Sequence, residues 1–270
     1  MSAPEADVLC GVLLHPAGHT LSPVLHGEAY RELGLRARYE VFDVPAERLA
    51  ASLAELRARG VRQLSVSLPH KERALALADA ASPAARAIGA ANTLTRAADG
   101  SLHADNTDWL GVLRALEPHG SLEGARARVL GAGGAARAAV YALLQMGAAV
   151  AIANRTRERA ERVARELGCV VDVAGEPYDV LVNATSVGMQ PHTDGTPLAA
   201  AELLPGALVF DLVYRPLETR LLREARARGC RTQDGLAMLV HQAVEQVRLW
   251  SGRAPDPAGL RRSAERALGV

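Results

Sequence analysis

Near the middle of the chain a predicted strand, residues 126–130, leads into a glycine-rich turn: Arg126-Ala127-Arg128-Val129-Leu130-Gly131-Ala132-Gly133-Gly134-Ala135-Ala136. The turn follows the Gly-x-Gly-x-x-Gly/Ala pattern of dinucleotide-binding loops, with Ala136 as the third small residue. In this pattern the first glycine allows a tight turn, and the second lets the backbone approach a pyrophosphate. The third small residue lets the following helix pack closely on the strand, with its N-terminus facing the phosphates. We therefore predict a phosphate-binding loop that contains Gly131, Ala132, Gly133, Gly134 and Ala135.

The sequence around this turn has the periodicity that such a loop requires. Apolar residues at helical spacing follow the turn, and residues 148–153 read as the next strand. One further strand is predicted to end near Asn183, and another to span residues 207–211. Helices are predicted over about 157–167 and 217–228. A strand before, a helix after and a second strand at this distance favour a Rossmann-type α/β domain.

The end of the second strand indicates which dinucleotide is bound. A protein that binds NAD normally places Asp or Glu there, about 20 residues beyond the glycines. Here the strand ends in Asn154-Arg155-Thr156, and Arg159 lies one helical turn further on. Arginine is common in this chain, so one Arg alone is weak evidence. The missing acid together with Arg155 nevertheless favours NADP, because guanidinium groups bind a 2′-phosphate well.

The N-terminal third also alternates strands and helices. Strands are predicted over residues 8–14, 39–44 and 62–68, with helices from Pro23 and from residue 45 between them. Ser22 is the expected N-cap of the first helix, before Pro23 at its first position. This order argues for a parallel sheet. Two short strands around Asp99-Gly100 read as a hairpin, and amphipathic helices begin near residues 236 and 257.

Lys71, in Ser65-Val66-Ser67-Leu68-Pro69-His70-Lys71, is the only lysine in the chain. A lysine ammonium can give up a proton in a suitable environment, whereas an arginine guanidinium stays protonated. Pro69 is expected at the first position of a helix, which would place Lys71 beyond the carboxyl end of a strand, where α/β sheets bind ligands. We interpret Lys71 as functional; the alternative is a solvated lysine in a first helical turn.

Composition narrows the class of protein further. The net charge is +1, and no basic block suggests nucleic acid or a membrane surface as a partner. No stretch reaches the ~18 apolar residues of a membrane span, and acidic residues rather than basic ones precede the first strand. Cys10, Cys169 and Cys230 lie far apart, outside any metal-binding spacing, so we expect no metal site and a reduced, cytoplasmic protein.

Several segments, in order along almost the whole chain, resemble the motifs of the shikimate dehydrogenase family. Besides the glycine-rich turn and the Lys71 segment, they are Thr20 to His26, Gly89 to Leu94, Asn106-Thr107-Asp108, Asn154 to Thr156, Asn183 to Gly188, Asp211 to Pro216, and Gly235 to Leu239 with Gln242. Four positions depart from the family pattern: Thr20 replaces Ser, Gly27 and Ser65 each replace Asn, and Ser67 replaces Thr. Thr20 and Ser67 keep the hydroxyl group.

The resemblance implies two α/β domains. Residues 1–105 plus 236–270 would form a substrate-binding domain with a parallel or mixed sheet, to which the C-terminal helices return. Residues 106–235 would form the Rossmann-type NADP-binding domain, with the active site in the cleft between the two. The implied reaction is reversible NADPH-dependent reduction of 3-dehydroshikimate to shikimate, a step toward aromatic amino acids. A small-molecule substrate is the expected partner, and the protein is expected to be a monomer or homodimer.

The resemblance also implies roles for individual residues. Lys71 is the expected proton donor, and Asp108 its carboxylate partner. Substrate contacts are expected from Thr20, Ser22, Ser67, Asn92, Tyr214 and Gln242. Further cofactor contacts are expected from Asn154, Arg155, Thr156, Arg159, Thr185, Ser186, Gly235 and Met238. From periodicity alone Gln242 would be a solvated helix residue, and Asp108 an ordinary first-turn acid.

Two other functions compete with this one. A related enzyme could act by the same mechanism on quinate or on an aminated shikimate, and the size of the pocket near Thr20 and Ser67 would decide. A regulator that binds NADP without catalysis is a different class of protein, and Lys71 and Asp108 argue against it because a sensor needs neither. We expect shikimate to be preferred over quinate.

Overall fold

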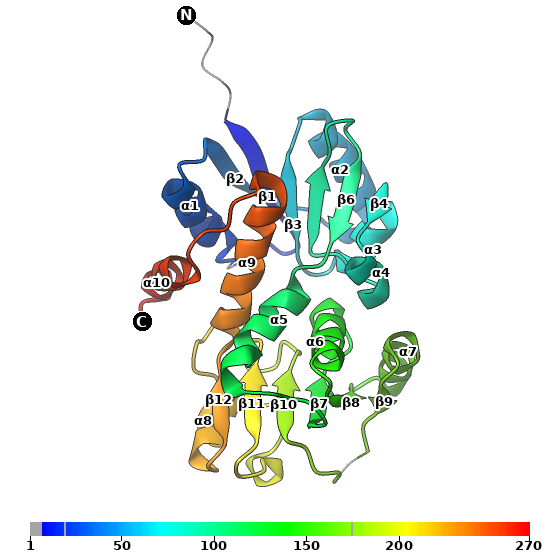
Figure 1. The fold of residues 1–270 in the computed structure, drawn as a ribbon, viewed down its shortest axis with the longest axis vertical. Coiled ribbons are helices and arrows are strands. Elements are labelled where there is room, and N and C mark those ends of the chain that lie inside the picture. The colour runs from blue at the N-terminus through cyan, green and yellow to red at the C-terminus, as the bar shows by residue number, and fades with distance from the viewer. Residues whose placement is uncertain (1–6, 19, 174) are drawn as a thin grey trace, which may run out of the picture. The chain divides into compact units, whose positions relative to one another are not determined.

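The computed structural model describes residues 7–18, 20–173 and 175–270. The chain divides into two compact units (Figure 1). Unit 1 consists of Met1–Thr107 and Gln242–Val270, and unit 2 of Asp108–His241. In the part of the chain that the structure describes, no helix has the length and apolar character needed to cross a membrane.

Unit 1 contains a mixed six-stranded sheet in the order β2-β1-β3-β5-β6-β4. Its strands are β1 (Val8–Leu14), β2 (Ala37–Asp43), β3 (Gln63–Val66), β4 (Ala80–Ala81), β5 (Thr93–Arg96) and β6 (Leu102–Asp105). β1 pairs in parallel with β2 and β3, as expected for strands joined by helices. β5 pairs antiparallel with β3 and with β6, so the predicted hairpin is confirmed.

The helices of unit 1 correct two sequence-based predictions. They are α1 (Ser22–Leu33), α2 (Leu49–Ala58) after a short 3₁₀ turn η1 (Ala46–Arg48), α3 (Lys71–Leu77), α4 (Pro83–Ile88), α10 (Pro257–Leu268) and the last ten residues of α9 (Gly235–Ser251). Ser22 is the first residue of α1 rather than its N-cap, which is Leu21. Pro69 is not the first residue of α3, because His70 N–H bonds to the Ser67 carbonyl at 2.9 Å and closes a turn before the helix begins.

Unit 2 contains a six-stranded sheet in the order β12-β11-β10-β7-β8-β9, and all its strand pairs are parallel. The strands are β7 (Arg126–Leu130), β8 (Ala149–Ala153), β9 (Val170–Val171), β10 (Val180–Asn183), β11 (Leu208–Asp211) and β12 (Arg231–Gln233). β7 lies between β8 and β10, so the strand order reverses there. In doubly wound sheets the ligand binds beyond the carboxyl ends of the strands at this reversal.

The helices of unit 2 follow the same alternation. They are α5 (Asp108–Leu116), α6 (Gly134–Gln145), α7 (Arg157–Leu167), α8 (Arg220–Ala227), the start of α9, and the short 3₁₀ turns η2 (Glu117–His119) and η3 (Ala200–Glu202). One face of the sheet packs Val129 and Ile152 against Ala136 and Val140 of α6. The opposite face packs residues such as Leu181 under α8. Burial on both faces is what a parallel sheet requires, because helices cover both its sides.

Candidate functional site

In unit 1, most of the polar residues predicted to bind substrate lie along one edge of the sheet, the edge formed by the carboxyl ends of β1 and β3. β1 and β3 are parallel, so their carboxyl ends lie at the same edge, which also holds the first residue of β5 and the last of β6. Thr20 and Ser22 follow β1, Ser67 and Lys71 follow β3, and Asn92 precedes β5. The sheet register therefore gathers segments far apart in the sequence along one edge.

Asn92 is the centre of a buried hydrogen-bond cluster at this edge. Its Oδ1 accepts from the Thr107 N–H at 2.7 Å and from the Thr93 hydroxyl at 2.8 Å. Its Nδ2 donates to Thr107 Oγ1 at 2.9 Å and approaches Gln242 Oε1 at 3.4 Å. Thr107 Oγ1 in turn donates to the Gln242 carbonyl at 3.0 Å. The structure therefore brings Asn92 and Gln242, two predicted substrate residues, into one cluster.

The expectation from periodicity that Gln242 faces solvent is wrong. Its exposed fraction is 6%, because this face of α9 packs against the polar edge of the sheet rather than against water. Sequence reasoning also missed Gln246, which lies one helical turn later and is also buried. The available signal was the spacing of four residues between Gln242 and Gln246, which places both glutamines on one face of the helix.

Thr20 and Ser22, both predicted to contact substrate, are hydrogen-bonded to each other. Thr20 Oγ1 accepts from the Ser22 N–H at 3.2 Å and lies 3.1 Å from Ser22 Oγ. Ser22 also hydrogen-bonds Tyr39, whose pKa is raised above its ordinary value by burial. The Tyr39 hydroxyl donates to Ser65 Oγ at 2.6 Å. Ser65, one of the departures from the family pattern, is therefore buried and engaged by protein groups.

The segment that carries Lys71 is anchored by its backbone. The Ser67 N–H donates to the Leu13 carbonyl at 2.8 Å, and the Lys71 carbonyl accepts from the Ala91 N–H at 2.9 Å. These bonds fix the segment beside β1 and beside the residue that precedes Asn92. Lys71 is half-buried as the first residue of α3. Asp108 begins α5 in unit 2 and is buried.

In unit 2, the glycine-rich turn has the predicted strand-turn-helix context. Gly131 has φ +115°, and a Cβ there would lie 2.8 Å from the Ala184 carbonyl oxygen. Gly133 is the N-cap of α6, and a Cβ there would meet no protein atom within 4 Å. Ala136 is fully buried against the sheet. The first glycine is therefore required by the fold, whereas the second leaves the helix N-terminus accessible to an anion.

The end of β8 carries the predicted 2′-phosphate contacts. Asn154 Nδ2 donates to the Thr156 carbonyl at 3.0 Å, which shapes the turn into α7. Arg155, Thr156 and Arg159 are exposed. Arg157 forms an ion pair with Glu161 at 2.9 Å, whereas Arg155 and Arg159 have no acidic partner among the residues that the structure describes. Two guanidinium groups are thus available to bind phosphate.

Asp211 organises the loops after β10 and β11. It accepts from Asn183 Nδ2 at 2.9 Å, from the Thr219 hydroxyl at 2.7 Å and from the Val213 N–H at 3.0 Å. Burial outweighs these bonds and raises the pKa of Asp211 to about 6. Asn183 Oδ1 accepts from both the N–H and the hydroxyl of Thr185, so this predicted cofactor residue is held in place.

The remaining predicted residues have differing surroundings. Ser186 is exposed, and Tyr214 is half-buried in the loop after β11. A Cβ at Gly235 would lie 2.5 Å from the Leu212 carbonyl oxygen, so packing alone demands glycine there. Met238 is buried in the core of unit 2.

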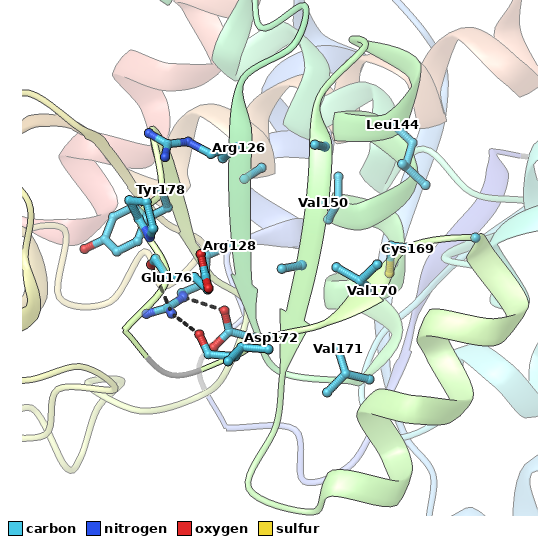
Figure 2. A pocket seen from close by; sticks show the side chains of 16 residues that line it. Arg126, Arg128, Leu144, Val150, Cys169, Val170, Val171, Asp172, Glu176 and Tyr178 are labelled. Atoms are coloured by element: carbon cyan, nitrogen blue, oxygen red, sulfur yellow. Dashed lines mark hydrogen bonds and ion pairs between the residues drawn. The ribbon is translucent and has the colours of Figure 1, made fainter.

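A cavity of about 400 Å³ in unit 2 lies away from the glycine-rich turn (Figure 2). Its walls include the first three residues of β7 and of β8. These are the amino-terminal ends of the two strands, whereas Gly131 follows the carboxyl end of β7. Arg128 beside it pairs with Asp172 at 2.8 Å and lies over the Tyr178 ring. Because its charge is satisfied by protein groups, we interpret this cluster as structural.

The strand order and the glycine-rich turn define a Rossmann-type α/β protein that carries a second α/β unit. A shikimate dehydrogenase (NADP(+)) from Thermus thermophilus is 48% identical over 263 residues, covering 96% of this chain and 98% of that protein. The chain belongs to the shikimate dehydrogenase family.

Family models and solved structures agree with this assignment. The shikimate dehydrogenase substrate binding domain matches residues 12–94, shikimate / quinate 5-dehydrogenase residues 114–186, and the shikimate 5'-dehydrogenase C-terminal domain residues 235–265. A shikimate 5-dehydrogenase from a second strain of Thermus thermophilus, solved with NADP(H) and shikimate, has a TM-score of 0.91 and 44% identity, covering 97% of this chain and 100% of that one. Quinate dehydrogenase from Corynebacterium glutamicum, solved with NAD, has a TM-score of 0.87 and 31% identity, with the same coverages of 97% and 100%.

Proposed function

We propose that this chain catalyses the reversible NADPH-dependent reduction of 3-dehydroshikimate to shikimate. The observation that carries the proposal is that both units together, over almost the whole chain, match a shikimate dehydrogenase solved with NADP(H) and shikimate. Residues 1–105 plus 236–270 bind the substrate, and residues 106–235 bind NADP. The buried Asn92 cluster supports the first assignment, and the glycine-rich turn between β7 and α6 supports the second.

The chemistry of Lys71 fits the proton transfer. NADPH, when bound, supplies a hydride to the substrate carbon. Negative charge then develops on the ketone oxygen, which requires a proton donor beside it. The Lys71 ammonium gives that proton, and in the reverse direction the Lys71 amine takes it back. Asp108 is the second proposed catalytic residue, and its carboxylate accepts a hydrogen bond from a substrate hydroxyl.

The substrate hydroxyls and carboxylate have different partners. Asn92 and Gln242 bind hydroxyl groups, and their separation of 3.4 Å lets both reach one ligand. Thr20 and Ser22 bind the carboxylate. Ser67 and Tyr214 complete the set of proposed substrate contacts.

The cofactor contacts follow the strand ends of unit 2. Backbone N–H groups of Gly131 to Ala135 bind the pyrophosphate, and Arg155 and Arg159 bind the 2′-phosphate. The adenosine side of the site is completed by Asn154 and Thr156. Proposed contacts elsewhere on the cofactor are Thr185, Ser186, Gly235 and Met238.

An absorbance assay of NADP reduction with shikimate and quinate side by side tests the proposal. Thr20 adds a methyl group, relative to Ser, beside the substrate carboxylate, and this crowds the extra hydroxyl that quinate carries there. Ser67 is one methyl group smaller than Thr and loosens the opposite wall, and each such change is worth only ~1–3 kcal/mol. We expect kcat/KM for shikimate to exceed that for quinate at least ~100-fold, which corresponds to about 2.7 kcal/mol.

The outcomes separate the alternatives. Comparable rates with both substrates would show that the pocket interpretation is wrong and that this is a quinate/shikimate enzyme. A preference for an aminated shikimate would assign the chain to that branch. A folded protein that binds NADP but turns over none of these substrates would be the non-catalytic regulator.

We also propose a cytoplasmic location. The three cysteines are free thiols, a state that a reducing compartment maintains. Fractionation of the source cells with an antibody against this chain tests the proposal, and recovery outside the cytoplasm would contradict it.

A further inference from the structure

Gln246 uses the full hydrogen-bonding capacity of its side-chain amide inside unit 1. Its exposed fraction is 1%. Its Oε1 accepts from Ser65 Oγ at 2.8 Å and pairs with His26 Nε2 at 3.1 Å. Its Nε2 donates to the Asn92 carbonyl and to Thr93 Oγ1, both at 3.0 Å. A carboxamide offers two acceptor positions and two N–H donors, and here all four are used.

The partners on the Oε1 side determine which way the amide faces. The Ser65 hydroxyl has one proton, and because Tyr39 donates to Ser65 at 2.6 Å, that proton is directed to Gln246. Burial lowers the pKa of His26 to about 4, so its ring is neutral at pH 7. Gln246 Oε1 is an acceptor 3.1 Å from His26 Nε2, so we assign the tautomer that carries its proton on Nε2, and in this tautomer Nδ1 accepts from the Tyr30 hydroxyl at 3.3 Å. Both neighbours are donors, so the amide oxygen must face them and the NH₂ group must face Asn92.

The side-chain NH₂ group of Gln246 fixes the orientation of the Asn92 amide through Thr93. Thr93 Oγ1 accepts from Gln246 and donates its own proton to Asn92 Oδ1 at 2.8 Å. The Thr107 N–H donates to the same Oδ1 at 2.7 Å. With two donors on Oδ1, the Asn92 amide cannot reverse without placing N–H groups against N–H and O–H donors. Asn92 therefore directs its Nδ2 toward Thr107 Oγ1 at 2.9 Å and toward Gln242 Oε1 at 3.4 Å, and the N–H on the Gln242 side is the one from which a ligand oxygen would accept.

We propose that Gln246 is a positioning residue for substrate recognition, which acts through Thr93 and the Asn92 carbonyl to hold the Asn92 carboxamide with its NH₂ group toward the substrate. Gln246 itself has no hydrogen-bonding capacity left for a ligand. The inference rests on the proposed function, because it assigns a role in binding the hydroxyl groups of that substrate. Ser65 anchors Gln246 and so has a structural purpose at the position where the family motif carries Asn.

A double-mutant cycle on the full-length protein tests this role. Gln246→Met keeps the length of the side chain but removes its donors and acceptors. We expect it to lower kcat/KM for shikimate about 10- to 100-fold, mainly through KM, with KM for NADP changed less than about twofold. In an Asn92→Ala background the same substitution should lower kcat/KM less than about threefold, because the group that it positions is gone.

Thr93→Val and Val247→Ala complete the design. Thr93→Val removes the bridging hydroxyl at nearly constant volume, and it should reproduce the loss and also be non-additive with Asn92→Ala. It keeps the inference testable if Gln246→Met does not fold. Val247, fully buried on the same helix, is the control for lost packing, and Val247→Ala should leave KM for shikimate unchanged.

The results distinguish failure of the proposed function from failure of the role assigned to Gln246. Turnover of shikimate by the wild-type protein is measured first, and its absence would overturn the proposed function and this inference with it. If the wild type is active but the losses from Gln246→Met and Asn92→Ala multiply, Gln246 does not act through Asn92 and only this inference fails. An equal rise in KM for shikimate in Val247→Ala would likewise overturn it, because lost packing would then explain the effect.

Discussion

The two glycines of the nucleotide-binding turn should respond oppositely to the same substitution. Gly131 has φ +115°, a region that L-residues rarely adopt, and a Cβ there would lie 2.8 Å from the Ala184 carbonyl oxygen. For an alanine at position 131 the backbone conformation costs about 1–3 kcal/mol, and displacing the neighbouring backbone costs about 1–3 kcal/mol more. We therefore expect Gly131→Ala to lower the free energy of unfolding by about 2–6 kcal/mol.

Gly133→Ala is the matched control for the fold. Gly133 has φ −91° and its Cβ would meet no protein atom within 4 Å. Alanine is a poorer N-cap than glycine, which lowers the free energy of unfolding by about 0.5–1 kcal/mol. Alanine also restricts the unfolded chain, which raises the free energy of unfolding by a similar amount, so the net change should be less than about 1 kcal/mol. The added methyl group faces the proposed pyrophosphate position, and we expect NADP affinity to fall about 10- to 100-fold.

Two measurements on the purified variants decide between these expectations. Urea denaturation without cofactor gives the free energy of unfolding, and calorimetric titration gives the dissociation constant for NADP. Wild-type stability of Gly131→Ala would refute the argument from crowding against Ala184. Wild-type NADP affinity of Gly133→Ala would refute the placement of the pyrophosphate at this turn.

Three further predictions concern single residues. Lys71→Arg keeps the charge but removes a transferable proton, so kcat should fall by about two to four orders of magnitude; normal turnover by the folded variant would exclude Lys71 as the acid. Arg155→Ala should cost about 1.5–3 kcal/mol of NADP affinity and leave NAD binding almost unchanged, and equal weakening of both cofactors in titrations would show that Arg155 is only a surface charge. Burial raises the pKa of Asp211 from 3.8 to about 6. Its neutral form therefore stabilises the fold below about pH 4, and this contribution, on the order of 3 kcal/mol, is lost as the pH rises through about 6. Urea denaturation between about pH 4 and 8 should show this loss in the wild type and not in Asp211→Asn, and an identical pH dependence in both would contradict the assignment.

Much of unit 2 was predictable because its signals are local. The limits of β7 and α7 agree with the predicted residues. β7 ends at the glycine-rich turn, and Thr156 and Gly168 cap the two ends of α7. β9 and β12 were not predicted, because strands of two and three residues carry no periodicity of their own and form only by pairing with β8 and β11. The start of α3 was misplaced because the turn that excludes Pro69 from the helix is made by a bond between His70 and Ser67.

The amino-acid sequence by itself determined the alternation of strands and helices, the glycine-rich turn, the missing acid after β8 and the single lysine. Each of these depends on residue types at short spacing, which local stereochemistry and charge make readable. Only the tertiary structure decided that Gln242 and Gln246 face the interior and contact Asn92, which lies 150 residues before Gln242. Helical periodicity places Gln242 off the apolar stripe, and a polar side chain there is solvated or buried depending on what packs against it. The packing partner is a sheet edge assembled from distant segments, and no local pattern on α9 encodes it.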